Sequence, residues 1–518
     1  MSGENGENDA EHRTGRQRYL DRRRFLMATG TLAGVGVLSG NVGGQDGGTT
    51  TAGGETTTES GTTTQQPEEP SLQEQYPGLR ILSADPQNAE AASRTTYESF
   101  ITPREEHYIR NHYSTPDIDA EEWTVSLTGA FDEEVELTMD EIRNDFSTET
   151  VTHTMQCSGN GRSYFEPQVG GNQWTFGAVG NTVWTGTPLS DILEEYGADT
   201  SQNMWLSAMG GEAPEGEDIF TRSIPMSKVM DDCLLAYEMN GSPMNDDHGF
   251  PVRLLVPGWF GNNNVKWVQR LHLMDMMVYG PEWETEDQQT YTHWQQYSYR
   301  LIPIDEEVNT RPRIDVFDTQ DQMDDPDIRY PYMYDQMVKS LVGYPPEDAT
   351  VTPGPAGTIE VVGVAWAGDD EVASVEVSTD GGESWSEAEF FGPVVGATSW
   401  RQFRYVWEPE PGDYTVMSRA TDDRGRTQPA TISAPDEKLV RITDDKYPWN
   451  VDGYGATAYE PLGVAVTVSQ GETETPGGET TTAGGTTGGQ TTTTGGETTT
   501  VGGETTTGSE TTTDNSSS

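Results

Sequence analysis

The chain has 518 residues, of which 86 are Asp or Glu and 30 are Lys or Arg, so its formal net charge is −56. This charge makes nucleic acid a poor partner, because a phosphate backbone needs basic side chains. Only five of the basic residues are lysines. That imbalance and the dense negative charge are typical of adaptation to very high salt, where charges are screened within roughly 3 Å. The 13 Trp, 21 Tyr and 13 Phe are too many for a disordered chain.

The first 45 residues have the pattern of an export signal. Arg-Arg-Arg-Phe-Leu at 22–26 precedes an apolar run over 27–38, which is too short to span a bilayer. The pattern resembles a twin-arginine signal and predicts an extracellular or cell-surface location. Neither an A-x-A pattern nor a lipobox cysteine follows the run, so an uncleaved anchor stays an alternative.

Gly, Thr and Glu dominate two further segments, 46–76 and 469–518, for which we predict a linker and a disordered tail. The hexapeptide Gly-Gly-Glu-Thr-Thr-Thr recurs at 53–58, 477–482, 495–500 and 502–507. The alternative is a Thr-glycosylated stalk, with Asn515 as a possible N-glycan acceptor.

The remaining length predicts two domains. Residues 77–345 combine short alternating strands, such as 123–128, with short helices, such as 188–196, which indicates an α+β domain. Over 346–468, alternating segments separated by turn signals are typical of a β-sandwich. The expected strands include 359–366, 372–378, 405–407 and 414–420.

The segment 154–162 carries the strongest chemical signal, because Cys157 is followed by Ser-Gly-Asn-Gly161-Arg162. Backbone amides and a guanidinium near a thiol lower its pKa, and the thiolate is the form that binds metal. A soft thiolate suits a redox transition metal. The alternative is an inert buried thiol, which is the interpretation we favour for Cys233.

Two cysteines are too few for a cysteine-ligated iron–sulfur cluster, and no C-x-x-C-H motif is present for covalent haem. We therefore expect neither cofactor. A disulfide between Cys157 and Cys233 is arithmetically possible, but sequence alone does not bring them together.

The cysteine segment resembles the cysteine loop of the sulfite oxidase family of molybdopterin enzymes, which usually reads Gln-Cys-Ala-Gly-Asn-Arg-Arg. Here Gly161 stands in place of the first arginine. Further blocks match in the same order at 108–112, 174–181, 235–241, 248–253, 265–267, 294–300, 378–385 and 419–429. The resemblance covers about 80–468 and implies a molybdopterin-binding domain followed by an immunoglobulin-like dimerisation domain, and hence a homodimer.

The resemblance implies that Cys157 is the thiolate ligand of molybdenum, with the other ligands coming from the pterin dithiolene and oxo groups. Arg110 and Arg162 would line an anion pocket. In a chain of this charge, local guanidinium groups must reverse the sign before a small oxyanion can approach. Trp174 would form a wall of the pocket, and Tyr299 would hydrogen-bond the substrate.

Four further residues match positions that hold the pterin and its phosphate: His112, His248, Arg253 and Lys266. Burying Lys266 between two apolar residues costs several kcal/mol without a partner, which a phosphate could supply. A surface salt bridge for Arg110 and a satisfied turn histidine for His248 are the structural alternatives.

Two residues are left undecided by the sequence. Tyr297 would share a face with Tyr299 if this segment were a strand, and Arg401 would have to reach across from the second domain.

The leading interpretation is an exported molybdenum enzyme that oxidises sulfite to sulfate and passes electrons to an external carrier, such as a copper protein or a cytochrome. A nitrate or sulfoxide reductase of the same family is one alternative. A cell-surface binding protein that has lost the metal is another.

Overall fold

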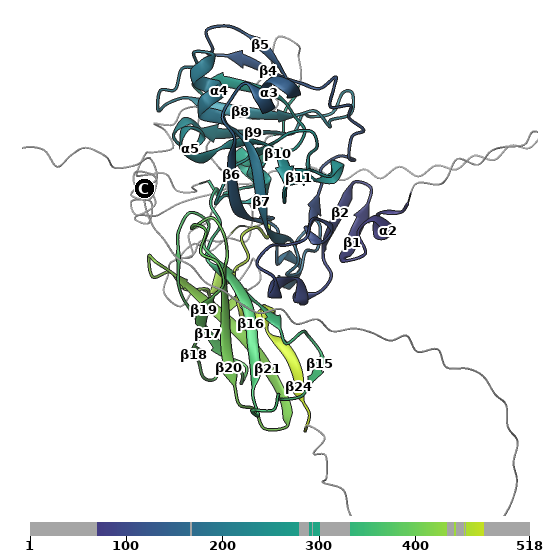
Figure 1. Ribbon diagram of the computed structural model, residues 1–518, viewed down its shortest axis with the longest axis vertical. Coiled ribbons are helices and arrows are strands. Elements are labelled where there is room, and N and C mark those ends of the chain that lie inside the picture. The colour runs from purple at the N-terminus through teal and green to yellow at the C-terminus, as the bar shows by residue number, and fades with distance from the viewer. Residues whose placement is uncertain are drawn as a thin grey trace, which may run out of the picture. The chain divides into compact units, whose positions relative to one another are not determined.

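The computed structural model (Figure 1) describes residues 70–165, 168–278, 290–292, 294–300, 332–432, 440–441, 450 and 452–470. All of them belong to one compact unit of the chain. Helix and strand are mixed, and most of the elements are strands.

A small antiparallel sheet opens the described chain and supplies Arg110. Its strands pair in the order β1 (Leu79–Ala84), β2 (Gln87–Ala91) and β3 (Ile109–Arg110). The short helices of this part are α2 (Leu72–Gln75), η1 (Arg94–Glu98) and η2 (Arg104–Glu106). Helix α2 begins at a capping box between Ser71 and Glu74. Regular structure therefore starts inside the segment 46–76, where we predicted only a linker.

Two larger sheets form the body of the first domain. One has the order β11-β10-β7-β6 with β12 also on β10, and its strands are β6 (Glu149–Gln156), β7 (Val179–Pro188), β10 (Leu234–Met239), β11 (Ser242–Pro243) and β12 (Arg253–Leu255). The other has the order β5-β4-β13-β8-β9, and its strands are β4 (Thr124–Gly129), β5 (Val135–Thr138), β8 (Trp205–Gly210), β9 (Thr221–Pro225) and β13 (Val268–Met274).

Three short helices contribute to the core of this domain: α3 (Met139–Asn144), α4 (Leu189–Glu195) and α5 (Met226–Asp232). Helix α3 begins at a reciprocal capping box between Thr138 and Glu141. Ile142 and Leu189 are fully buried in one apolar cluster with residues of β4, β8 and β13. Full burial of such a side chain stabilises the fold by about 1.5 to 3 kcal/mol. Helix α4 lies within the predicted helix 188–196.

The remaining short helical elements are η3 (Arg162–Tyr164), η4 (Asp246–His248), η5 (Gly261–Asn263), α6 (Trp294–Tyr297) and η6 (Glu460–Leu462).

The second domain is a sandwich of two sheets, drawn in green to yellow in Figure 1. The first sheet has the order β14-β16-β20-β19, with β14 (Lys339–Tyr344), β16 (Ile359–Trp366), β19 (Glu389–Phe391) and β20 (Arg401–Trp407). The second has the order β15-β24-β21-β17-β18, with β15 (Ala349–Val351), β17 (Val372–Ser378), β18 (Ser386–Glu387), β21 (Gly412–Asp422) and β24 (Val464–Val468). A separate pair joins β22 (Thr431–Ile432) to β23 (Val440–Arg441).

The sandwich begins earlier than the predicted boundary at 345. Strand β14 lies before this boundary, yet it pairs with β16 over Lys339–Tyr344. Five of its six residues are buried, so it lacks the apolar–polar alternation by which a sandwich strand is recognised in sequence.

Strand β6 is held by hydrogen bonds from residues beyond the first domain. The Trp366 indole donates to Gln156 Oε1 at 2.8 Å. The Trp400 backbone N–H donates to Thr154 Oγ1 at 2.7 Å, and the Gln336 side chain donates to Thr154 O at 2.6 Å. The C-terminal end of β6, where the cysteine loop begins, is therefore fixed from both domains.

The signal segment 1–45, almost all of the tail 469–518 and Asn515 lie outside the described residues. Within the described part, we find no helix with the length and apolar character needed to cross a membrane.

Candidate active site

Cys157 directly follows strand β6. Its backbone N–H donates to Ala178 O at 2.9 Å, which extends the pairing with β7 by one residue. The chain then turns, because the Asn160 N–H donates back to Cys157 O at 3.0 Å. The side chain is thus presented at the end of a strand whose position is fixed by both domains.

The two thiols are separate and lie in different surroundings. Both are free and buried, so they form no disulfide, and the prediction of a buried Cys233 is confirmed. Burial raises the pKa of both thiols. Arg110 and Arg162 oppose this rise in the pKa of Cys157, whereas the Asp232 carboxylate adds to the rise in the pKa of Cys233. Only Cys157 faces the guanidinium groups that favour a thiolate.

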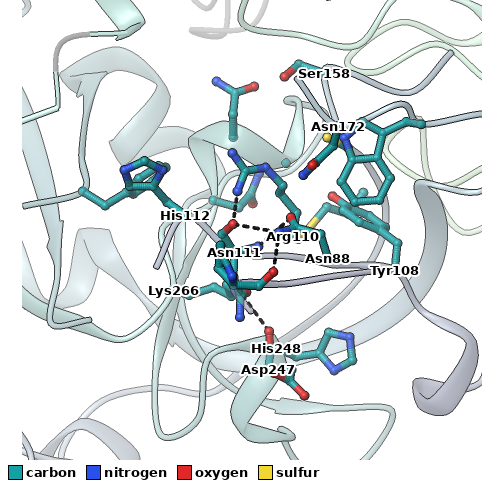
Figure 2. Close-up of a pocket in the computed structure, with 18 of the residues that line it drawn as sticks. Asn88, Tyr108, Arg110, Asn111, His112, Ser158, Asn172, Asp247, His248 and Lys266 are labelled. Carbon is teal, nitrogen blue, oxygen red and sulfur yellow. Dashed lines mark hydrogen bonds between the residues drawn. The ribbon is translucent and has the colours of Figure 1, made fainter. Parts of the chain in front are cut away.

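A cavity of about 370 Å³ lies beside Cys157. All nine residues for which we predicted a role line it: Arg110, His112, Cys157, Arg162, Trp174, His248, Arg253, Lys266 and Tyr299. Figure 2 shows Lys266, Asp247 and His248 grouped at one side of this region and Ser158 and Asn172 at the other. The fold therefore brings the predicted residues together, while their roles stay predictions.

Arg162 reaches the cavity although Gly161 departs from the family pattern. Gly161 has a φ of +95°, and a Cβ there would lie 3.0 Å from the Ala456 Cβ, so both conformation and space favour glycine. Arg162 Nε donates to Asp452 O at 3.1 Å, and Nη1 donates to Asn172 O at 3.2 Å. Both acceptors are backbone carbonyls, so these two bonds orient the guanidinium without cancelling its charge.

Arg110 ends strand β3 and is exposed to the cavity. Its Nη1 donates to Asn111 O, a bond visible in Figure 2. Of the charges near Cys157, Arg110 does most to lower the pKa of the thiol. These contacts differ from the surface salt bridge that was the alternative for this residue.

Two tyrosines from distant parts of the sequence form one wall of the cavity. The rings of Tyr299 and Tyr454 have centroids 4.5 Å apart, and the Arg162 guanidinium lies 4.6 Å from the Tyr454 centroid. Trp174, with 1% of its surface exposed, also lines the cavity. The strand alternative for Tyr297 is wrong, because Trp294–Tyr297 is helix α6.

Lys266 and Arg253 donate to the backbone carbonyls of neighbouring residues, Asp247 and His248. Lys266 Nζ donates to Asp247 O at 2.7 Å and to Asn111 Oδ1, and Arg253 Nη1 donates to His248 O at 2.8 Å. Burial lowers the pKa of Arg253 to about 10, and burial together with repulsion from Arg253 lowers the pKa of Lys266 well below its usual value. An anion such as a phosphate would stabilise both cations.

Several polar atoms of the cavity lining fit a ligand with hydrogen-bonding edges. They are shielded from solvent and have no hydrogen-bond partner in the described part of the chain: His107 Nε2, Glu212 Oε2, His248 Nδ1, Arg253 Nε and Asn262 Oδ1. Folded proteins leave few buried polar atoms unpaired. The set contains donors and acceptors, as the ring edge of a pyranopterin requires, so these residues fit the cofactor that the resemblance implies.

The cavity is positive within a strongly negative chain. Four basic side chains and two carboxyl groups line it, and burial raises the pKa of Glu212 to about 7. Burial lowers the pKa of His112 to about 4 and that of His248 to about 3. Both histidines are therefore neutral at pH 7, and the excess positive charge comes from the three arginines. Such a site attracts an anion locally.

Sequence reasoning missed Glu212, Asp247 and Tyr454. Asp247 immediately precedes His248, and this adjacency was the only available signal. Glu212 is one of 86 acidic residues, and Tyr454 lies far from the motifs of the first domain. Arg401, left undecided, is not part of the cavity lining and stacks on Phe390 with its guanidinium 4.5 Å from the ring centroid.

Lys339 lies behind the cysteine loop and ties it to the C-terminal segment. This lysine of β14 has 1% of its surface exposed, and its Nζ donates to Ala456 O at 3.0 Å and to Asn160 O at 3.4 Å. Burial, assisted by repulsion from Arg94, lowers the pKa of Lys339 to about 7. The folded chain therefore releases a proton that the unfolded chain keeps up to about pH 10.

We expect Lys339→Met to flatten the pH dependence of stability. Between pH 7 and 9 the unfolded chain binds more protons at Lys339, so the unfolding free energy of the native protein rises with pH relative to that of the variant. The expected gain is about 2 kcal/mol, measured by urea unfolding in molar potassium chloride. Arg404→Met, at a half-exposed ion pair of the sandwich, is the control. A pH-independent difference between the native protein and Lys339→Met would contradict the shifted pKa.

Together, a buried thiol in a cationic, pterin-compatible cavity and a separate sandwich define a molybdopterin-binding chain with a second domain. Residues 112–281 match the family model of the oxidoreductase molybdopterin binding domain, and 330–436 match that of the Mo-co oxidoreductase dimerisation domain. The predicted fold class is confirmed.

Relatives support the same assignment. The chain is 32% identical to mitochondrial sulfite oxidase of Rattus norvegicus over 374 residues, which cover 69% of this chain and 63% of the rat protein. It is 31% identical to sulfite oxidase of Gallus gallus over 397 residues, which cover 74% of this chain and 77% of the chicken protein. The chain belongs to the sulfite oxidase family of molybdopterin-dependent oxidoreductases. It spans less than two thirds of the rat protein.

Two other similarities bear on fold and substrate. The NADH nitrate reductase of Solanum lycopersicum is 28% identical over 410 residues, which cover 74% of this chain and 40% of the reductase. The crystal structure of the sulfane dehydrogenase SoxCD from Paracoccus pantotrophus matches with a TM-score of 0.57 and 24% identity, covering 79% of this chain and 95% of that chain. The latter likeness shows a shared fold.

Proposed function

We propose that the chain is a molybdenum-cofactor oxidoreductase that oxidises sulfite to sulfate. The observation that carries the proposal is the position of Cys157, whose thiol lines the same cavity as Arg110 and Arg162. A soft ligand and two anion-binding groups in one cavity suit a metal that reacts with an oxyanion.

Different residues of the cavity bind the metal, the pterin and the substrate. Cys157 holds the metal through its thiolate, and when bound the cofactor supplies the two-electron oxygen-atom transfer chemistry. His248, Arg253 and Lys266 hold the pterin and its phosphate. Arg110 and Arg162 bind the substrate oxyanion, because their guanidinium groups offer paired donors.

The aromatic residues complete the substrate side. The Tyr299 hydroxyl donates a hydrogen bond to the bound oxyanion. Trp174 and Tyr454 keep water away from their sides of it, which strengthens the charge-assisted contacts. His112 packs edge-on against Trp294 with ring centroids 4.4 Å apart and forms part of the rim on the pterin side.

The test combines metal content with turnover. Protein purified in molar potassium chloride from a molybdenum-replete host is expected to contain one molybdenum atom per chain by mass spectrometry and to reduce ferricyanide when sulfite is added. A metal-free protein would favour the third interpretation, a binding protein that has lost the metal. Rapid, stoichiometric hydrogen peroxide formation from sulfite and oxygen would contradict transfer to an external carrier, because oxygen would then be the electron acceptor.

Nitrate reduction is the second candidate, favoured by the similarity to plant nitrate reductase. Nitrate is also a trigonal oxyanion, so the same two arginines would bind it. Two assays separate the activities: nitrate reduction with reduced viologen as electron donor, and sulfite oxidation with ferricyanide as electron acceptor. The larger kcat/KM identifies the preferred substrate. A match to the dimerisation domain speaks against the sulfoxide reductases.

We further propose an exported homodimer that hands electrons to a copper protein or a cytochrome. The dimer follows from the dimerisation domain, and export follows from the arginine motif at 22–26. The ferricyanide assay on fractionated cells tests export. If the protein is exported, the activity is expected outside the cytoplasmic membrane. Activity confined to the cytoplasm would contradict it.

A further inference from the structure

Arg222 is a buried cation outside the set of predicted residues. It belongs to strand β9, next to the cavity-lining Phe220, and its exposed fraction is 0%. Nη1 donates to Thr221 O at 2.7 Å and to Thr292 Oγ1 at 3.2 Å. Among the described residues, Nε and Nη2 are shielded from solvent and make no well-aligned hydrogen bond, but the Tyr299 hydroxyl is close enough to interact with the guanidinium as an acceptor.

This arrangement is costly for a purely structural residue. Leaving donors of a buried guanidinium unpaired costs several kcal/mol. Within the described residues, the hydrogen bonds of Arg222 go to a carbonyl and a hydroxyl and to no carboxylate. An apolar residue of similar volume would fill the space at lower cost, so the retained charge points to a role in the adjacent site.

Aromatic rings connect Arg222 to the cavity. Its guanidinium carbon lies 4.2 Å from the Phe220 centroid, 5.3 Å from that of Tyr299 and 6.0 Å from that of Trp294. Phe220 and Tyr299 line the cavity, so Arg222 stands directly behind its wall. Burial lowers the pKa of Arg222, and the charge of Tyr299 does most to oppose that lowering.

The chemistry of the pair fixes the direction of the phenolic proton. An arginine carries donors and no acceptor, so the Tyr299 oxygen can only accept towards Arg222. The Tyr299 O–H must then point to another acceptor. The Tyr454 ring packs against that of Tyr299 with centroids 4.5 Å apart and an interplanar angle of 34°, which restricts the Tyr299 ring.

We propose that Arg222 is a positioning residue that makes the Tyr299 hydroxyl a hydrogen-bond donor to an oxyanion in the cavity. The inference rests on the proposed function in one respect, namely that the ligand is an oxyanion. The charged and titratable groups packed against Tyr299 are Arg222 from β9 and Tyr454. Further out, the Arg162 guanidinium lies against Tyr454, and Arg110 from β3 repels Arg222. Arg222 differs from the other arginines in being fully removed from solvent, where its field is screened least.

Arg222→Met tests the proposal through ligand binding and through steady-state kinetics. Sulfate affinity, measured by calorimetry without turnover, is expected to fall about tenfold, as for the loss of one good hydrogen bond to a charged group. In the metal-loaded enzyme, KM for sulfite is expected to rise about tenfold while kcat changes less than about twofold, because the lost hydrogen bond serves the bound anion. Unchanged affinity and an unchanged KM would overturn the proposal.

Tyr299→Phe makes the test specific. With the hydroxyl removed, Arg222→Met should change sulfate affinity less than about twofold, since the effect passes through that hydroxyl. An undiminished effect in the Tyr299→Phe background would show that Arg222 acts alone and would refute a positioning role. If Arg222→Met does not fold, Arg222→Lys allows the same comparison. Arg222→Lys is expected to lower sulfate affinity about threefold, and this loss must also vanish in the Tyr299→Phe background.

Arg94→Met is the matched control. Arg94 is buried at 3% exposure with its guanidinium carbon 4.4 Å from the Phe176 centroid, and it does not line the cavity. Arg94→Met should alter neither sulfate affinity nor KM for sulfite. The two proposals fail separately: a wild-type protein that binds sulfate and shows the Arg222–Tyr299 coupling but does not oxidise sulfite would refute only the function.

Discussion

Cys157→Ser is expected to abolish sulfite oxidation, with kcat falling by at least about a thousandfold, or about 4 kcal/mol of transition-state stabilisation. A serine hydroxyl is a hard and weakly acidic ligand that does not replace a thiolate at a soft redox metal. The fold should persist. The backbone bonds at this position, from Cys157 N–H to Ala178 O and from Asn160 N–H to Cys157 O, do not involve the side chain.

Cys233→Ser is the matched control for this experiment. Cys233 is also buried, at 1% exposure, and its Sγ donates to Lys228 O at 3.4 Å, a bond that serine can retain. We expect full molybdenum content and turnover for Cys233→Ser, and loss of turnover at an unchanged unfolding midpoint for Cys157→Ser. Wild-type activity in Cys157→Ser would disprove the ligand assignment.

The sandwich was predictable because one face of each of its central strands is buried. Alternation over 359–366 and 372–378 gave the bounds of β16 (Ile359–Trp366) and β17 (Val372–Ser378). Strand β14 was not predicted, because nearly all its residues are buried and its sequence therefore shows no alternation of apolar and polar residues. The helix Trp294–Tyr297 escaped because four residues are too few to display a helical period.

The site was predictable only where a motif preserved residue order. Arg110, Cys157, His248 and Lys266 stand in contiguous blocks, and the fold gathers those blocks around one cavity. Tyr454 reaches the same cavity from the C-terminal segment through tertiary contact alone. Arg222 likewise comes to lie behind the cavity wall through tertiary contact, since the local sequence indicates neither its burial nor its proximity to Tyr299.

Arg162→Gln is expected to lower kcat/KM for sulfite by one to two decades, mainly through KM. A charge-assisted hydrogen bond contributes about 1.5 to 3 kcal/mol, and each 1.4 kcal/mol corresponds to about a factor of ten. Glutamine retains a donor for one of the two carbonyl contacts, Asp452 O and Asn172 O, but loses the positive charge. The thermal midpoint should therefore move much less than KM.

Arg143→Gln separates the loss of charge at the site from the loss of an arginine stacked on a tyrosine. Arg143 lies with its guanidinium carbon 5.7 Å from the Tyr237 centroid and outside the cavity lining, whereas Arg162 lies 4.6 Å from the Tyr454 centroid within it. Steady-state kinetics over a range of salt should show a raised KM only for Arg162→Gln. High salt should diminish the difference little, because Arg162 has only 6% of its surface exposed and buried charges are poorly screened. Equal KM values in both variants would mean that Arg162 supports the wall formed by Tyr454 and leaves substrate binding to Arg110.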